Sequence, residues 1–115
     1  MTAQQLSKII AKGMEEKKAS DILVMDLRSV KDTVTDFFVI CSGNSGTQLD
    51  AISKSIEEQV HKAAESPAWK VEGRSNGQWI LMDYVNVVAH IFLSDTRAYY
   101  GLEDLWGDAK TTRIS

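Results

Sequence analysis

Residues Val71 to Ala109 carry the strongest structural signal in the chain and read VEGRSNGQWILMDYVNVVAHIFLSDTRAYYGLEDLWGDA. Together with the residues just before them, they predict three strands, over Trp69–Arg74, Gln78–Tyr84 and Val87–Phe92. Asn76-Gly77 is typical of a two-residue hairpin, and Val85-Asn86 makes a second tight connection. We therefore expect an antiparallel meander, followed by a helix that starts near Ser94 or Asp95 and ends at Gly107.

Upstream of this region the chain predicts two amphipathic helices and two buried strands. Each helix begins with a capping pair, Thr2 with Gln5 and Ser45 with Gln48. The expected ranges are a helix at Thr2–Lys18, strands at Asp21–Leu27 and Asp36–Ser42, and a helix that opens in Gly43–Gly46 and ends before Pro67. The order α-β-β-α-β-β-β-α predicts a single α/β (α+β) domain over residues 1–107, with a mixed sheet of about five strands flanked by helices. Residues 108–115 are expected to form a flexible tail.

The composition describes one ordinary globular domain and argues against several classes of partner. The 115 residues are 43% hydrophobic and 25% charged, which is enough chain for one modest core. The net charge of −3 argues against affinity that depends on a phosphate backbone, because such proteins cluster Lys and Arg. A mildly acidic protein is better matched to a basic protein partner.

The single cysteine indicates a reducing compartment, and the hydropathy pattern predicts no membrane-spanning segment. Cys41 is the single cysteine, so no internal disulfide can form. With only His61 and His90 beside it, a zinc site would need distant carboxylates, and we expect no metal and no cofactor. No apolar run reaches roughly 18 residues, and the N-terminus shows neither a signal peptide nor an Arg-rich transit segment. We therefore expect a cytoplasmic protein.

One turn has features of an anion site. The run SGNSGT, Ser42 to Thr47, leads from a strand into a helix N-terminus, where free N–H groups and the helix dipole attract anions. The lysine and spacing of a P-loop are missing, and a capping serine also explains the turn. Nucleotidyl transfer would need two acids spaced two apart on the next strand, and Glu72 and Asp83 do not reproduce that pair. We expect no catalytic residues, and nucleotide binding at Ser42, Gly43, Asn44 and Ser45 is the alternative.

The aromatic residues are the remaining candidates for a site. On the last helix, Leu102, Leu105 and Trp106 share one face, and Tyr100 lies nearly opposite at about 100° per residue. An exposed Tyr100 beside Arg97, Glu103 and Asp104 would make an interface anchor with a charged rim.

The middle strand of the meander is apolar on both faces. Trp79, Leu81 and Asp83 alternate with Ile80, Met82 and Tyr84, so periodicity leaves open which face is buried. We expect an exposed subset among Trp79, Tyr84 and Tyr100. His90 lies in an apolar strand and is interpreted as a hydrogen-bonded structural residue, not a base.

Several long motifs, DFFVICSGNS, VEGRSNGQWILMDY, VVAHIF and RAYYGLEDLW, together resemble the ribosomal silencing factors, also called Iojap-related proteins. The resemblance covers nearly the whole chain and implies a fold similar to nucleotidyltransferases without their catalytic acids. It also implies binding to the large ribosomal subunit through ribosomal protein uL14, beside the face that the small subunit joins. A factor bound there excludes the small subunit sterically and represses translation under nutrient limitation.

The resemblance also suggests which positions meet the partner. Its motifs place contacts at Trp79, Tyr84 and Tyr100, with Leu81, Arg97 and Glu103 as weaker candidates. Family members often have glycine after the strand, where this chain has Val85, and valine disfavours positive φ. Contact with rRNA is expected to be secondary at most. A homodimer of the free protein through the same aromatic surface is a further hypothesis.

Overall fold

The structure, a computed structural model, describes residues 1–115 except 31–32, 34, 65–66, 102–106, 108 and 115. Its elements are α1 (Ala3–Glu16), β1 (Ser20–Asp26), β2 (Phe37–Gly43), α2 (Gly46–Ala64), β3 (Lys70–Glu72), β4 (Trp79–Asp83), β5 (Val87–Leu93), α3 (Ser94–Tyr100) and β6 (Lys110–Arg113). The α+β architecture and the predicted meander are confirmed, because β3, β4 and β5 pair antiparallel in sequence order. The sheet of the described residues runs β3-β4-β5-β2-β1-β6, and β2 and β5 form its parallel pair.

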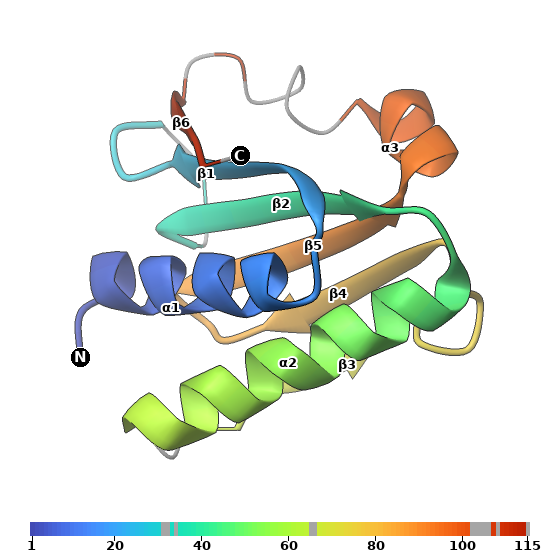
Figure 1. The fold of residues 1–115 in the computed structure, drawn as a ribbon. Helices are drawn as coiled ribbons and strands as arrows, with labels where there is room; N and C mark the ends of the chain where they lie inside the picture. The colour runs from blue at the N-terminus through green and yellow to red at the C-terminus, as the bar shows by residue number, and fades with distance from the viewer. Residues whose placement is uncertain (31–32, 34, 65–66, 102–106, 108, 115) are drawn as a thin grey trace.

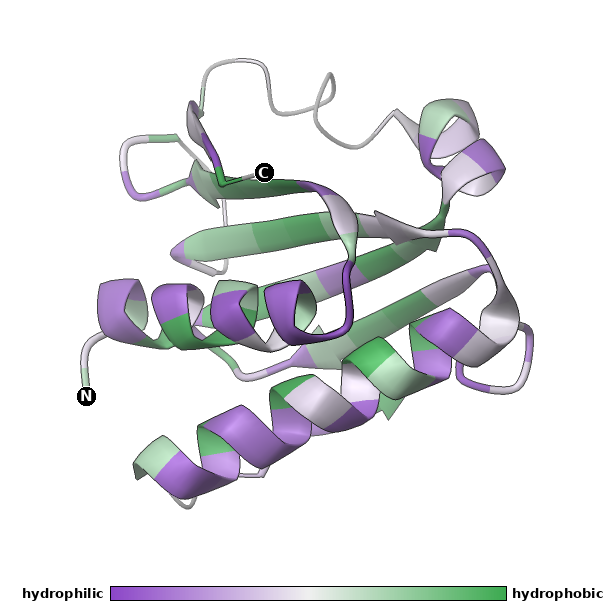
Figure 2. Cartoon of the chain, viewed as in Figure 1, coloured by the Kyte–Doolittle hydropathy of each residue, from purple (hydrophilic) through white to green (hydrophobic). Residues whose placement is uncertain are grey.

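Both long helices lie on the same face of the sheet (Figure 1). Their inward residues are those that the helical periodicity predicts, such as Ile10 and Met14 on α1 and Ile52 and Ile56 on α2. The hydropathy colouring shows the polar residues of both helices turned outward and the strands largely apolar (Figure 2). Burial of the apolar faces of the helices against the sheet is the main driving force for the fold, because each Å² of apolar surface removed from water stabilises it by roughly 25 cal/mol.

The two helices approach each other closely at Gly13. A Cβ built there would lie 2.9 Å from the Ile56 Cα. The Gly13 carbonyl also accepts a buried hydrogen bond from the Ser55 hydroxyl at 2.8 Å. The predicted capping pair of α1 is present, since Thr2 and Gln5 exchange side-chain and backbone bonds.

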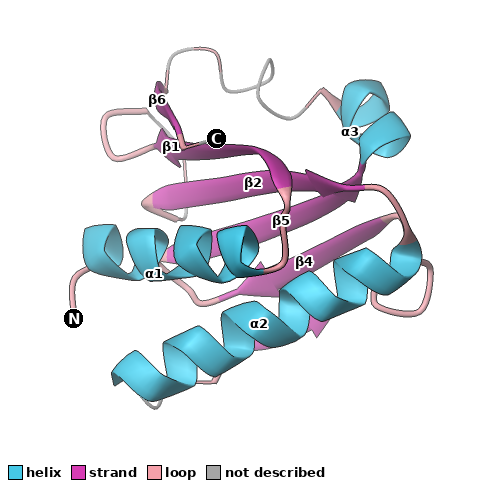
Figure 3. Ribbon diagram, viewed as in Figure 1, coloured by secondary structure: helices cyan, strands magenta, loops and turns pink. Residues whose placement is uncertain are grey.

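Two predictions at the C-terminal end are wrong. The predicted helix does not continue unbroken to Gly107: α3 ends at Tyr100, because Gly101 adopts a left-handed conformation and its N–H caps the Arg97 carbonyl. Residues 102–106 of the predicted helix lie outside the described residues. Residues 110–113 are not a flexible tail: they form the edge strand β6, paired antiparallel with β1 (Figure 3). The pattern KTTR is exposed and has no buried face, so its strand conformation comes from the open edge of β1.

One connection within the meander differs from expectation, and the other is tight, as predicted, but strained. The β3–β4 connection runs over residues 73–78, longer than a two-residue Asn76-Gly77 turn. Gly73 has φ 91°, and a Cβ there would lie 1.9 Å from the Trp79 carbonyl oxygen, so glycine is required. Between β4 and β5, Val85 itself adopts φ 75°, and the Asn86 N–H donates to the Tyr84 carbonyl. That bond and angle define a strained γ-turn centred on a β-branched residue.

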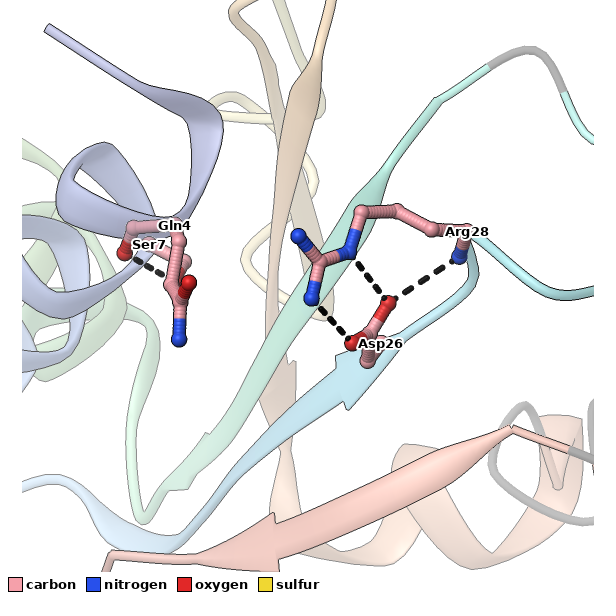
Figure 4. A network of polar contacts seen from close by, with 4 residues as sticks. All are labelled: Gln4, Ser7, Asp26 and Arg28. Carbon is pink, nitrogen blue, oxygen red and sulfur yellow. Dashed lines mark hydrogen bonds and ion pairs between the residues drawn. The ribbon is translucent and has the colours of Figure 1, made fainter.

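The C-terminal end of β1 carries an ion pair between Asp26 and Arg28. Arg28 donates to both carboxylate oxygens of Asp26, at 3.0 and 2.7 Å (Figure 4). The Arg28 guanidinium also lies over the ring of Phe37. The hydrogen bond from Arg28 lowers the pKa of the Asp26 carboxyl below its usual value.

Within the described ranges, no helix combines the length and apolar composition that crossing a bilayer requires.

Candidate partner-binding site

The face of the sheet opposite α1 and α2 carries a cluster of aromatic side chains, which we call the aromatic face. The strand alternation places Trp79 on β4, Phe38 on β2, and His90 and Phe92 on β5 on this side, while Tyr100 reaches it from α3. The opposite positions on the same strands, such as Ile80, Met82 and Ala89, belong to the helix-covered core. The two apolar faces of β4 therefore pack in different surroundings.

Trp79 is the centre of the aromatic face. Its ring stacks on Phe92 with centroids 4.9 Å apart and contacts Tyr100 at 4.6 Å. Phe92 is wholly buried, Trp79 is partly exposed, and Tyr100 is 48% exposed. Tyr99, which is 85% exposed, meets Tyr100 edge-on at 5.4 Å. The cluster thus runs from the core to a surface where aromatic rings are open to a partner.

His90 lies within this cluster as a buried structural residue. Its Nδ1 accepts a hydrogen bond from the Trp79 Nε1–H at 3.1 Å, and the Phe38 ring packs edge-on against it at 4.7 Å. Burial lowers the pKa of His90 from 6.5 to about 4, so the imidazole is neutral at physiological pH. A neutral, hydrogen-bonded histidine agrees with its interpretation from sequence.

The structure does not bring all the predicted contact residues together. Trp79 and Tyr100 touch, and Leu81 lies on the same face of β4 and is partly exposed. Tyr84 is buried on the opposite face, within the helix-covered core, and is not available as a surface contact. Burial raises the pKa of its phenol to about 12. Glu103 and Asp104 lie outside the described residues.

Arg97 is buried and does not form part of an exposed charged rim. Its Nη1 donates to the Asp21 carbonyl at 2.6 Å and to the Ser42 hydroxyl at 2.9 Å. The Asp21 carbonyl is presented where the register of β1 shifts against β2. Arg97 therefore ties α3, the helix that carries Tyr100, to the ends of β1 and β2.

The predicted anion turn uses its polar groups internally. The Asn44 N–H donates to Gln48 Oε1 at 2.7 Å, and Ser45 Oγ accepts from the Gln48 N–H at 3.1 Å. The Gln48 amide also donates to the Lys17 and Lys18 carbonyls, which links α2 to the end of α1. Ser42 accepts from Arg97, so these contacts give the nucleotide-binding alternative no support.

The remaining reactive groups of the described residues are either buried or dispersed. Cys41 is wholly buried in the helix-covered core, and desolvation raises the pKa of its thiol. Across the described ranges, no three His, Cys, Asp or Glu side chains gather closely enough to hold a metal ion. The aromatic face is the feature whose arrangement calls for a functional explanation.

The sequence did not single out Phe38, Phe92 and Tyr99 as members of this cluster. A signal was present, since Phe38-Ile40 and Val88-His90-Phe92 alternate with core residues at a period of two. It was hidden because both strands are apolar on both faces, so neither face stands out.

Comparisons with known proteins connect this architecture to a family. The whole chain, residues 1–115, matches the family described as "Ribosomal silencing factor during starvation". A ribosomal silencing factor from Bacillus subtilis is 40% identical over 109 residues, covering 95% of this chain and 91% of that protein. A chloroplastic Iojap protein from Zea mays is 38% identical, with 87% of this chain and 42% of that protein covered.

Solved structures agree with these sequence matches. A crystal structure of a Chromobacterium violaceum protein superimposes with a TM-score of 0.87 at 29% identity, covering 100% of this chain and 94% of that one. A Bacillus halodurans structure gives a TM-score of 0.81 at 32% identity, covering 96% of this chain and 99% of that one. With its fold and its match over residues 1–115 in agreement, the chain belongs to the ribosomal silencing factor family.

Proposed function

We propose that this protein binds the large ribosomal subunit through ribosomal protein uL14 and sterically prevents the small subunit from joining it, which represses translation under nutrient limitation. The observation that carries the proposal is the contact of Trp79 with Tyr100 on the aromatic face, at a centroid distance of 4.6 Å. A mouse relative, 33% identical over 95 residues, is named for mitochondrial assembly of the large ribosomal subunit, which supports that subunit as the partner.

The chemistry of the aromatic face suits a protein partner. Partly exposed Trp and Tyr rings provide most of the affinity at many interfaces, because they bury a large area with few rotatable bonds. The net charge of −3 favours encounter with a basic protein surface. Repression then follows from occupancy alone, so the mechanism uses binding without catalysis or a cofactor.

Removal of either ring should weaken binding. We expect Trp79→Ala and Tyr100→Ala each to cost about 2 kcal/mol, or roughly 30-fold in affinity. The measurement is co-sedimentation with isolated large and small subunits, followed by a subunit-joining assay. The wild type should sediment with the large subunit alone and reduce the yield of joined ribosomes, and both variants should lose these effects.

A second exposed tryptophan provides the matched control. Trp69 is 72% exposed and belongs to the segment before β3, away from the aromatic face. Trp69→Ala removes the same side chain and should leave binding unchanged. Equal losses for Trp69→Ala and Trp79→Ala, or binding to both subunits, would contradict the proposal. Thermal unfolding of each variant separates lost contacts from lost structure, and Tyr100→Ala has the smaller expected effect on folding.

The same rings could instead pair two copies of this chain. Light scattering at several concentrations tests that use, and a dimer that Trp79→Ala dissociates would assign the aromatic face to self-association in the free protein. If uL14 then bound the monomer but not the dimer, the two uses of the aromatic face would compete.

A further inference from the structure

The position of His90 in the aromatic face is not explained by stability alone. The imidazole is 4% exposed and is surrounded by the rings of Phe38, Trp79 and Phe92. Burying a polar ring among apolar ones costs free energy unless its polar atoms are hydrogen-bonded. A leucine or phenylalanine would fill this position of β5 without that cost.

The two ring nitrogens of His90 have unequal environments. Nδ1 accepts from the Trp79 indole at 3.1 Å, and because an indole N–H can only donate, Nδ1 is unprotonated and Nε2 carries the hydrogen. Nε2 is buried and has no hydrogen-bond partner among the residues that the structure describes. The hydrogen bond from Trp79 is therefore the polar interaction that His90 provides. His90 makes this bond although its own Nε2–H donor is unsatisfied.

The geometry shows how this bond constrains the tryptophan. Trp79 is opposite Phe92, and Leu81 is opposite His90, in the β4–β5 register, so the indole reaches His90 diagonally across the two strands. Stacking on Phe92, with an interplanar angle of 27°, limits the tilt of the indole. It does not choose which edge of the ring points along the sheet, and the bond to Nδ1 does.

We infer that His90 is a positioning residue that fixes the Trp79 ring in the orientation in which Trp79 and Tyr100 together meet the partner. This inference rests on the proposed use of the aromatic face for binding. An indole that is already oriented loses less conformational freedom on binding. Removing the acceptor should therefore weaken association about threefold to tenfold while every contacting side chain is still present.

Two variants separate the acceptor from the rest of the ring. His90→Leu removes the acceptor and fills the site with an apolar side chain. His90→Asn loses most of the ring and places Oδ1 near the former position of Nδ1, so an acceptor for Trp79 remains. Replacing an incompletely bonded buried group with an apolar one can be neutral for stability, so we expect His90→Leu to fold.

The primary readout is the Trp79 indole N–H resonance in ¹⁵N-labelled protein, assigned with Trp79→Phe, and its hydrogen-exchange rate. In the wild type this proton should exchange slowly. In His90→Leu it should exchange at least tenfold faster and shift upfield, and in His90→Asn it should keep most of its protection. Large-subunit affinity should follow the same order: wild type, then His90→Asn, then His90→Leu.

The outcomes distinguish this inference from the proposed function. If Trp79→Ala binds the large subunit as well as the wild type, the proposed contact is wrong, whatever the indole shows. If Trp79→Ala fails to bind but His90→Leu keeps both a protected indole and wild-type affinity, the positioning role is overturned. If His90→Leu does not fold, His90→Asn decides: an indole exchanging as fast as a free one also overturns the inference.

Discussion

Val85 shows most directly how one residue stores strain in this domain. It is the central residue of a γ-turn with φ 75° and is 57% exposed, so its side chain gains little from burial. Its amide donates to the Asp83 carboxylate at 2.7 Å, and the Tyr84 N–H donates to the Val87 carbonyl at 2.9 Å. The turn therefore keeps its geometry through hydrogen bonds in which position 85 takes part only with its backbone N–H.

Val85→Gly should stabilise the protein. Left-handed backbone costs a non-glycine residue roughly 1–3 kcal/mol, and the added flexibility of glycine costs about 0.5–1 kcal/mol. We expect a net gain of about 1 kcal/mol in the free energy of unfolding, measured by urea denaturation. Val71→Gly, in β3 with ordinary φ, is the control and should lose stability instead. If Val85→Gly also lowered the free energy of unfolding, the positive φ of Val85 would not cost the protein stability.

At the scale of elements, the α1–α2 contact determines how the core closes. Both helices have one apolar face, and the chain brings the two together where Gly13 removes a side chain and Ser55 supplies a hydrogen bond. The backbone of Ile56 is the nearest neighbour of a Cβ at position 13. A side chain there would push whole helices apart, because a backbone cannot rotate out of the way.

Gly13→Ala should therefore destabilise the protein, although alanine is the better helix former. Helix propensity favours alanine by about 1 kcal/mol, while overpacking against backbone costs typically 1–3 kcal/mol. We expect a net loss of about 1 kcal/mol in a thermal or chemical unfolding experiment. Lys12→Ala, at the exposed neighbouring position, should change stability by less than about 0.5 kcal/mol. An unchanged or raised midpoint for Gly13→Ala would show that α1 shifts at no cost.

At the scale of the whole molecule, the aromatic face makes the stability of the domain depend on pH. Burial lowers the pKa of His90 from 6.5 to about 4, so between these values the unfolded chain binds more protons than the folded one. The contribution of neutral His90 to the free energy of unfolding should be fully present above pH 6.5. It should fall by about 3 kcal/mol as the pH drops to about 4. Denaturation at stepped pH values checks this, and the slope over that interval should be much smaller in His90→Leu.

Local pattern was sufficient for much of the fold. The inward residues of α1 and α2, the strands of the meander and the capping pair of α1 follow from periodicity and turn chemistry, which act over a few residues. Trp79 and Tyr100 were identified as candidates from sequence, but their contact was not. It joins β4 to α3, so it depends on the register of β4 against β5 and on the end of α3 at Gly101.

The chain alone determined most of the segments that become helices and strands, because helical and strand periodicity is encoded within each segment. The exception is β6, whose strand conformation comes from the open edge of β1. Only the tertiary structure decided which face of an evenly apolar strand is covered. It buried Tyr84 beneath the helices and left Trp79 on the aromatic face, although Trp79 opens β4 and Tyr84 directly follows it. Likewise, Arg97 is buried because residues far away in the chain supply the Asp21 carbonyl and the Ser42 hydroxyl. Burial is a property of what packs on a residue, and for these side chains that partner is remote in sequence.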